Sequence, residues 1–313
     1  MNNGAEHKAF DVIVIGSGMG GMAAAAALSK AGHKVLLLEQ YKTLGGLSHS
    51  FSIDGFSWDA GIHYLNCVAP EDRERHILDW LSDTPIELAS MGAVYDTLHI
   101  GDEAPLALSR PFEAQARDFK DRFPGEAEAI DAWIAALKEG REAIMKITMT
   151  RAMPDIIGSA LKWWHSHAIE RWCKRTTQEV IDGITDNPVL AAAFAAQWFD
   201  HGGRPSEASF AMHALITGGY LESGAWYPKG GGASFVEHML PTITKAGGDA
   251  RADTKVETLL VEDERVVGVR TMRGDEIRAD AVISDIGARE TVNHLLPADC
   301  GHQDWIDEIR GLP

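Results

Sequence analysis

The sequence predicts an α/β fold: a parallel sheet of the Rossmann type with a β-meander, interrupted by a largely helical insertion. A buried run, DVIVIG, precedes a glycine turn, an alanine-rich helix and a second buried run, KVLLLE, which together predict one βαβ unit. From about Phe112 to His201, apolar residues recur at helical spacing. Between Lys255 and Asp285, short Val/Ile runs alternate with turn residues, which predicts a meander and a return to the sheet.

These patterns divide the chain into four segments. We expect residues 1–100 to form the first part of the sheet domain, 101–225 a helical substrate or cap region, 226–292 the returning part of the sheet domain, and 293–313 the start of a further substrate segment. The first strands are too apolar to have a wet face, so the sheet should be covered on both sides. The sheet domain is therefore predicted to be discontinuous in sequence.

Composition restricts the class of protein. A chain of 313 residues, 45% of them apolar, is long enough for two domains. The 29 basic and 46 acidic residues give a net charge of −17, which repels nucleic-acid phosphates and argues against a nucleic-acid partner. The cysteines lie too far apart for a zinc site and predict reduced thiols in a cytoplasmic protein: Cys67, Cys173 and Cys300. Neither a secretory leader nor an apolar stretch of membrane-spanning length is evident.

The glycine turn carries the strongest functional prediction. Gly16, Gly18 and Gly21 form GxGxxG between the first strand and the helix. In this context the first glycine permits a tight turn, the second lets a pyrophosphate approach the backbone, and the third allows close packing. The helix N-terminus favours the negative charge of that pyrophosphate. Glu39 ends the second strand, where a carboxylate can accept hydrogen bonds from ribose hydroxyls, so the sequence predicts a dinucleotide site.

A second glycine pair, Gly45-Gly46, follows Glu39 and extends this pattern in the manner of flavin enzymes. The stretches VIGSGMGGMAAAAALSKAGHKVLLLEQ, LGGLSHSF, GFSWDAGIHYL, WYPKGGGASFVEHM and IRADAVISDIGARETVNHLLP resemble the phytoene desaturase, carotenoid isomerase and retinol saturase family of FAD-dependent oxidoreductases. The resemblance covers both ends of the chain, but it covers the helical middle poorly. Within the family, SHSF and DAGIHY favour the retinol saturase and carotenoid isomerase branch.

The resemblance implies FAD as cofactor and NAD(P) as a candidate electron partner. It assigns Gly16, Ser17, Gly18, Gly20 and Gly21 to the pyrophosphate, Glu39 and Gln40 to the ribose, Gly45, Gly46 and Leu47 to the stretch toward the flavin, Val256 to the adenine, and Asp59, Gly61 and residues 227–232 to the region of the ring system. The family also closes its flavin site with a C-terminal Gly-Asp motif. This sequence lacks that motif, so the resemblance implies a chain truncated in mid-domain.

His63 and Tyr64 are the candidate catalytic residues, because DAGIHY would place them after a glycine near the flavin. A histidine can titrate near neutral pH and move a proton, although a hydrogen-bonded structural histidine is the common alternative. His49 is a weaker candidate of the same kind. His201, His213 and His238 lack the spacing of metal ligands, so no metal is expected.

Two further patterns each allow two interpretations. Four aromatic residues could line a tunnel for an apolar substrate or belong to the core: Trp198, Phe199, Phe210 and Trp226. Residues 151–175 combine basic and apolar side chains, which suits peripheral contact with an anionic membrane or simple packing of a helix on the protein. Those side chains are Arg151, Lys162, Arg171, Lys174 and Arg175, interleaved with Ile156, Ile157, Leu161, Trp163, Trp164 and Trp172.

The leading hypothesis is an FAD-dependent oxidoreductase that acts on C=C bonds of an apolar isoprenoid, a carotenoid or retinoid, as a saturase, desaturase or isomerase. Because a fold alone does not determine chemistry, an enzyme of the amine-oxidase type is an alternative. A truncated nucleotide-binding protein without catalysis is a third hypothesis. The expected location is the cytoplasm, with membrane association if residues 151–175 contact lipid.

Overall fold

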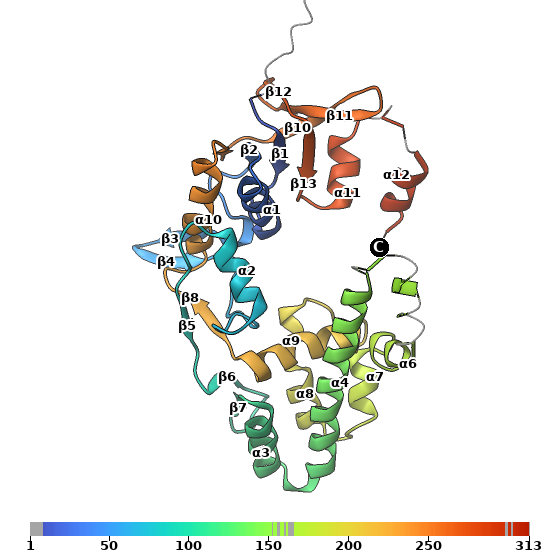
Figure 1. Cartoon of the computed structure of the whole chain (residues 1–313). Coiled ribbons are helices and arrows are strands. Elements are labelled where there is room, and N and C mark those ends of the chain that lie inside the picture. Colours follow the sequence, from blue (N-terminus) through green and yellow to red (C-terminus); the bar gives the residue numbers. More distant parts are fainter. Residues whose placement is uncertain are drawn as a thin grey trace, which may run out of the picture. The chain divides into compact units, whose positions relative to one another are not determined.

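The computed structural model describes residues 9–151, 153–154, 157–159, 161, 166–297, 300–301 and 303–312. The chain forms two compact units, whose elements Figure 1 labels. Unit 1 comprises Met1–His63, His76–Leu88 and Pro228–Pro313, and unit 2 comprises Tyr64–Arg75 and Ala89–Tyr227. Residues 64–75 and 89–100, which the sequence placed in the first part of the sheet domain, thus lie in unit 2.

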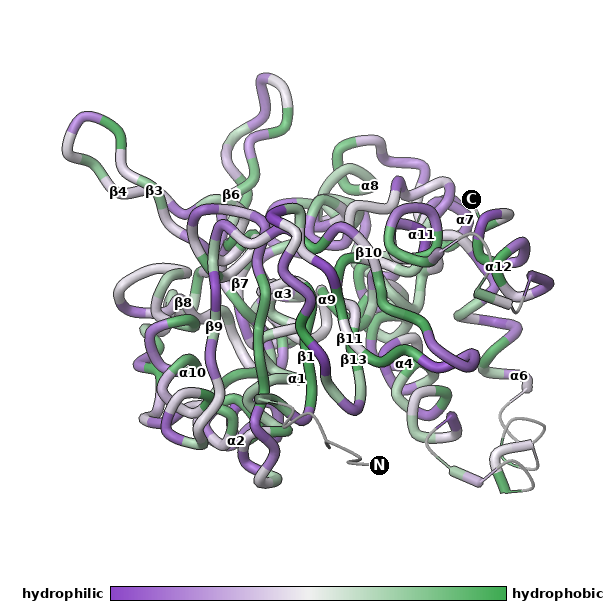
Figure 2. The backbone as a smooth tube through the Cα atoms, turned by 90° about the horizontal axis from the view of Figure 1, so that it is seen from above, coloured by the Kyte–Doolittle hydropathy of each residue, from purple (hydrophilic) through white to green (hydrophobic). Residues whose placement is uncertain are grey.

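Unit 1 is built on a parallel sheet of four strands in the order β13-β1-β2-β9. Their bounds are β1 Val12–Ile15, β2 Val35–Leu38, β9 Asp249–Arg251 and β13 Ala281–Ser284. Every residue of β1 and β2 is buried, as expected for parallel strands covered on both faces. The predicted βαβ unit is therefore confirmed, and the apolar β1 can be followed in Figure 2.

Two different layers cover this sheet. Helices α1 (Met19–Lys30) and α10 (Ala233–Lys245) pack together, and α1 contacts β1 and β2. Alternate residues of the same strands, such as Ile13 and Leu36, point instead into a core shared with the meander. The meander strands are β10 Val256–Glu262, β11 Arg265–Thr271 and β12 Glu276–Arg278. This arrangement confirms the predicted α/β fold with a meander.

The remaining elements of unit 1 are short. They include η1 (Gly46–Ser48), β3 (Ser50–Ile53), β4 (Phe56–Asp59), α11 (Ala288–Glu290), η5 (Thr291–Leu295) and α12 (Gln303–Arg310). Strands β3 and β4 form an antiparallel hairpin, which Figure 2 shows as a narrow projecting loop. Helix α2 (Arg73–Leu81) spans the border between segments of the two units, and β5 (Leu88–Ser90) and β8 (Trp226–Pro228) do the same.

Unit 2 is mainly helical, as the spacing of its apolar residues predicts. Its elements are the hairpin strands β6 (Val94–Leu98) and β7 (Leu106–Ser109), then α3 (Phe112–Arg122), η2 (Pro124–Glu126), α4 (Ala127–Arg151), α6 (Ser166–Ala168), η3 (Ile169–Cys173), α7 (Thr177–Asp182), α8 (Pro188–Ala195), η4 (Ala196–Asp200) and α9 (Phe210–Ser223). Local signals begin two of these helices. Thr176 and Glu179 form a reciprocal capping box at α7, and Asn187 caps α8 ahead of Pro188.

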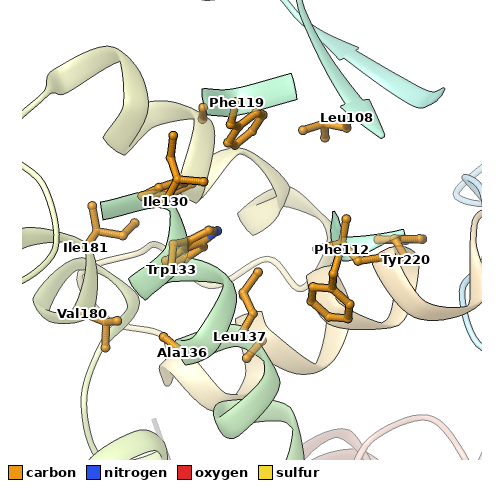
Figure 3. Packing of buried hydrophobic residues seen from close by; sticks show 14 of the residues in the cluster. Leu108, Phe112, Phe119, Ile130, Trp133, Ala136, Leu137, Val180, Ile181 and Tyr220 are labelled. Atoms are coloured by element: carbon orange, nitrogen blue, oxygen red, sulfur yellow. The ribbon is translucent and has the colours of Figure 1, made fainter. Parts of the chain in front are cut away.

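Aromatic rings and aliphatic side chains pack together in the core of unit 2, where Trp133 lies near Ile130 and Leu137 (Figure 3). The ring of Trp133 stacks on Phe194 with a centroid separation of 4.5 Å and meets Phe210 edge-on at 5.6 Å. Phe210 is completely buried, so this residue belongs to the core and does not line a tunnel. Phe199, in contrast, is 73% exposed.

The segment 151–175 is described in part. Trp172 is buried against Phe210, and its Nε1 donates to Glu139 Oε2 over 3.2 Å, so at this position the structure agrees with packing on the protein, the second of the two interpretations. The guanidinium of Arg171 lies over the same ring and pairs with Glu139. Lys162, Ile156, Trp163 and Trp164 lie outside the described residues. Within the described part of the chain, no helix is long and apolar enough to span a bilayer.

Candidate dinucleotide-binding site

A cavity of about 640 Å³ lies in unit 1 at the carboxyl ends of β1 and β2. Strand β1 has β2 on one side and β13 on the other, which is the kind of switch point where open α/β sheets bind ligands. The volume of the cavity falls within the range of small-molecule and cofactor sites. The cavity is lined by Ile15, Gly16, Gly18, Leu38, Glu39, Gln40, Gly46, Thr254, Lys255, Val256, Glu257, Met272, Asp285, Ile286, Glu290, His294 and Leu295.

The three glycines of the first turn are required for different reasons. Gly16 has φ +96°, a left-handed conformation that favours glycine. A Cβ atom at Gly21 would overlap the carbonyl oxygen of Gly16. Gly18 has φ −58°, which any residue can adopt, but a Cβ atom there would lie 3.3 Å from Asp285 Oδ2 in the cavity. Glycine at position 18 therefore preserves space for a ligand, whereas Gly16 and Gly21 maintain the turn.

Ser17 and Glu39 form a buried hydrogen-bonded pair behind the glycine turn. The backbone N–H and the hydroxyl of Ser17 both donate to Glu39 Oε2, over 2.9 and 2.7 Å. Tyr41 N donates to Oε1 over 2.8 Å. A carboxylate offers about four acceptor positions, so these three bonds leave roughly one for a ribose hydroxyl. Because Ser17 is completely buried, it supports the site from behind and does not line it.

The second glycine pair lies against the first turn. Gly45 N donates to Ser17 Oγ over 2.9 Å. Gly46 has φ +55°, and a Cβ atom on it would lie 2.9 Å from Gly18 Cα. His49, the weaker catalytic candidate, has its Nδ1 2.6 Å from Gly46 O. The sequence thus brings two glycine-containing turns together at one end of the cavity.

A second group of predicted residues forms a separate cluster in unit 1. Asp59 Oδ1 accepts hydrogen bonds from Ser50 Oγ and from Gly232 N, over 2.5 and 2.8 Å. Gly61 N donates to the carbonyl of Leu47 over 2.9 Å, and the Leu47 side chain is 74% exposed. The bond between Asp59 and Gly232 joins the β3–β4 hairpin to the glycine-rich loop before α10.

Six of the predicted cofactor residues line the cavity: Gly16, Gly18, Glu39, Gln40, Gly46 and Val256. Sequence reasoning missed Asp285, Lys255 and His294, which line it as well. Asp285 could have been found, because it ends the predicted strand segment DAVISD and the carboxyl ends of parallel strands meet at one edge.

The charges around the cavity are mainly negative. Four carboxylates line it, against one lysine and one histidine: Glu39, Glu257, Asp285 and Glu290, with Lys255 and His294. Glu257 pairs with Arg270 at 2.8 Å, and Glu290 lies 3.4 Å from His294. Among the residues that the structure describes, no cluster of three or more His, Cys, Asp or Glu side chains could hold a metal ion.

The two catalytic candidates have different environments. His63 is exposed and belongs to unit 1. Tyr64 begins a segment of unit 2, where its hydroxyl donates to Asp96 Oδ2 over 2.5 Å and its ring packs on Tyr95 and Tyr220. Burial and the neighbouring Asp96 raise the pKa of Tyr64 far above the usual value, so this hydroxyl keeps its proton.

A glycine turn at a helix N-terminus, a carboxylate after the next strand and a cavity at the sheet edge are typical features of dinucleotide-binding units of the doubly wound class. A family model described as flavin containing amine oxidoreductase matches residues 19–301, and the chain belongs to this family. Family membership supports a flavin cofactor. The turn, the remaining acceptor position on Glu39 and the cavity volume fit such a group.

Individual relatives refine this result. The chain is 34% identical to an all-trans-retinol 13,14-reductase of Danio rerio over 300 residues, 92% of this chain and 49% of the relative. It is 28% identical to a lycopene-forming phytoene desaturase of Pseudescherichia vulneris, over 91% of this chain and 57% of the relative. The chain therefore spans about half the length of the curated relatives it matches. The predicted resemblance to retinoid and carotenoid enzymes is confirmed.

A solved structure supports the fold independently. The crystal structure of an oxidoreductase from Methanosarcina mazei matches 96% of this chain and 65% of its own chain, with a TM-score of 0.65 and 18% identity. At this level of identity the similarity shows the fold alone.

Proposed function

We propose that the cavity of unit 1 binds FAD and that the protein is an FAD-dependent oxidoreductase acting on C=C bonds of an apolar isoprenoid, a carotenoid or retinoid. The observation that carries the proposal is the joining of the two glycine turns to Glu39 through Ser17 at the end of the cavity. The names of the relatives, a retinol reductase and a phytoene desaturase, supply the substrate class.

Each part of the cavity has a role in this proposal. The N-terminus of α1 beside Gly18 would hold the pyrophosphate, because amides without intrahelical partners attract anions. Glu39 would accept a ribose hydroxyl, and Val256 would lie beside the adenine. Bound FAD supplies the ring that accepts or donates hydride. The protein's task is then to hold the cofactor and to position an apolar substrate.

Proton movement is assigned to His63 within the same proposal. His63 is exposed, so its imidazole can exchange protons with solvent or substrate. Tyr64 is the second candidate, and its raised pKa limits it to donating a hydrogen bond. Replacing His63 by glutamine should lower the rate of turnover, while FAD binding is retained. An unchanged rate of turnover would exclude His63 as the group that moves the proton.

The proposal also includes the reductant, the cellular compartment and contact with a membrane. NAD(P)H is the candidate reductant, and the cytoplasm is the candidate compartment. All three cysteines are free thiols, which suits a reducing environment. Peripheral membrane contact through residues 151–175 loses one of its supports, because Trp172 is buried in the core of unit 2.

Two measurements test the proposal in sequence. The purified chain is incubated with FAD and desalted, and the released nucleotide is identified by liquid chromatography. The FAD-loaded protein is then assayed anaerobically in two ways while polyene absorbance is followed. With its flavin reduced it is mixed with all-trans-retinol, and with its flavin oxidised it is mixed with a carotenoid. Loss or gain of polyene bands supports the assignment. Reduction of the flavin by amines, with no change in any polyene, would favour the amine-oxidase alternative.

A further inference from the structure

Asp285 lies over the glycine turn. It directly follows β13, and its Oδ2 accepts a hydrogen bond from Gly21 N over 2.6 Å. A Cβ atom built on Gly20 would lie 2.5 Å from Asp285 Oδ1, and one built on Gly18 would lie 3.3 Å from Oδ2. The carboxylate therefore lies against the first turn of α1.

This position matters because α1 has no cap of its own. Its N-cap is Gly18, which has no side chain to accept a hydrogen bond, and its first turn contains no acidic residue. The first amides of a helix lack intrahelical partners, and together with the helix dipole they attract negative charge. Asp285 supplies that negative charge from the chain that follows β13. The same amides would hold the pyrophosphate of a dinucleotide.

The surroundings do not neutralise Asp285. Among the described residues it makes no ion pair, and its hydrogen-bond partner is the amide of Gly21. The cavity contains Lys255 and His294, but His294 lies beside Glu290, and Glu39 and Glu257 add two further carboxylates. Like charges oppose each other most strongly at close range, so a pyrophosphate at the turn would meet an unfavourable carboxylate.

We propose that Asp285 is a built-in competitor for the cofactor: its carboxylate occupies the anion site of α1 until the pyrophosphate displaces it. Asp285 thereby lowers affinity for the dinucleotide and speeds its release. This inference rests on the proposed function, since it takes the cavity to be the FAD site. Asp285 would then be a determinant of affinity for the dinucleotide that the spacing of the glycines does not reveal.

The test compares wild type with Asp285→Asn in buffer containing EDTA. Asparagine keeps an oxygen that can accept from Gly21 N, but it removes the charge. Titration calorimetry of the apoprotein should show FAD binding at least about tenfold tighter in the variant, a change of about 1.4 kcal/mol. ADP should also bind more tightly, because it carries the diphosphate. Riboflavin lacks phosphate, so its affinity should not change.

A matched control separates this effect from overall charge. Glu290→Gln removes one carboxylate from the same cavity, but Glu290 lies beside His294 and away from the turn, so its effect on FAD affinity should be clearly smaller. Asp285→Ser serves as a second variant if the amide disturbs folding, since a hydroxyl can also accept from Gly21 N. Circular dichroism checks that each variant is folded.

The outcomes distinguish the two proposals. FAD binding that is equal or weaker in both Asp285 variants would overturn the competition while leaving FAD binding by the wild type intact. Tighter binding of riboflavin to the same degree as FAD would also overturn it, because the effect would not depend on phosphate. If neither wild type nor variants bind FAD, the proposed function fails, and the competition fails with it.

Discussion

The two units use their interiors in opposite ways. Unit 1 contains a cavity of about 640 Å³ whose walls include glycine backbone and carboxylates. Unit 2 contains a cluster of packed aromatic rings, where a cavity of only about 20 Å³ remains between Trp133, Phe194 and their neighbours. Unit 1 is therefore organised to receive a ligand, whereas this core of unit 2 is organised to exclude solvent.

Buried ionisable groups show the same contrast. Glu39 in unit 1 is buried with three hydrogen-bond donors that suit a charged carboxylate. His213 in unit 2 is completely buried, and burial lowers its pKa to about 4, so the imidazole is neutral at pH 7. Burial also raises the pKa of Tyr95 and Tyr220. Hydrogen-bond donors thus surround Glu39 in unit 1, whereas burial favours the neutral forms of His213, Tyr95 and Tyr220 in unit 2.

The largest expected effect comes from the core of unit 2. Trp133→Ala removes the ring that stacks on Phe194 and should lower the free energy of unfolding by about 4 kcal/mol. Denaturant unfolding followed by near-ultraviolet circular dichroism measures the loss. The exposed Phe199 is the matched control, and Phe199→Ala should cost about 0.5 kcal/mol or less. Equal losses in the two variants would contradict the description of this core.

A glycine substitution in unit 1 should have the next largest effect on stability. Gly21→Ala places a methyl group against the carbonyl oxygen of Gly16, which cannot rotate away, and should destabilise the protein by about 3 kcal/mol. Gly183→Ala in unit 2 is the control. Gly183 has φ −80°, and the nearest atoms lie 3.5 Å from an added Cβ, so this change should be close to neutral. Thermal unfolding compares the two, and a neutral Gly21→Ala would show that the turn is not tightly packed.

The pH dependence of stability tests the neutral histidine. The folded pKa of His213, about 4, lies below the ordinary 6.5, so the unfolded state binds more protons between these values. The contribution of His213 to the free energy of unfolding is complete above pH 6.5 and is lost as the pH falls toward 4. The free energy of unfolding should therefore fall by about 2 kcal/mol between pH 7 and 5. Burial lowers the pKa of His201 as well, with the same sign. In His213→Gln this part of the slope should disappear, and an unchanged slope would contradict the assignment.

The smallest expected effect concerns the pair behind the glycine turn. Ser17→Ala removes the hydroxyl that bridges Glu39 and Gly45 N and should cost about 1 kcal/mol of stability. FAD affinity should fall with it, because the second glycine turn loses its tether to the first. Ser52→Ala, on the exposed hairpin, is the control and should change neither quantity. Parallel calorimetric titrations measure both variants, and identical FAD affinities would remove Ser17 from the site.

Local backbone geometry explains why the glycine turn and the position of Glu39 could be predicted from the sequence. Gly16 and Gly21 are required by a turn whose geometry depends on neighbouring residues, and Glu39 follows a strand that its apolar run predicts. Asp285 is 264 residues from the amide it contacts; the sequence predicts that its strand returns to the sheet, but not that this strand lies beside β1. The same limit applies to Tyr64, whose environment depends on Asp96 and Tyr220 in other elements of unit 2.

The binding of FAD to wild type and to Gly18→Val tests whether the cavity of unit 1 holds the cofactor. Gly18 has a backbone conformation that valine can adopt, so the fold should survive while the added side chain projects into the cavity beside Asp285. We expect wild type to retain FAD after desalting, with the absorbance bands of oxidised flavin, and the folded variant to retain none. Equal retention of FAD by the two proteins would contradict the assignment of this cavity as the cofactor site.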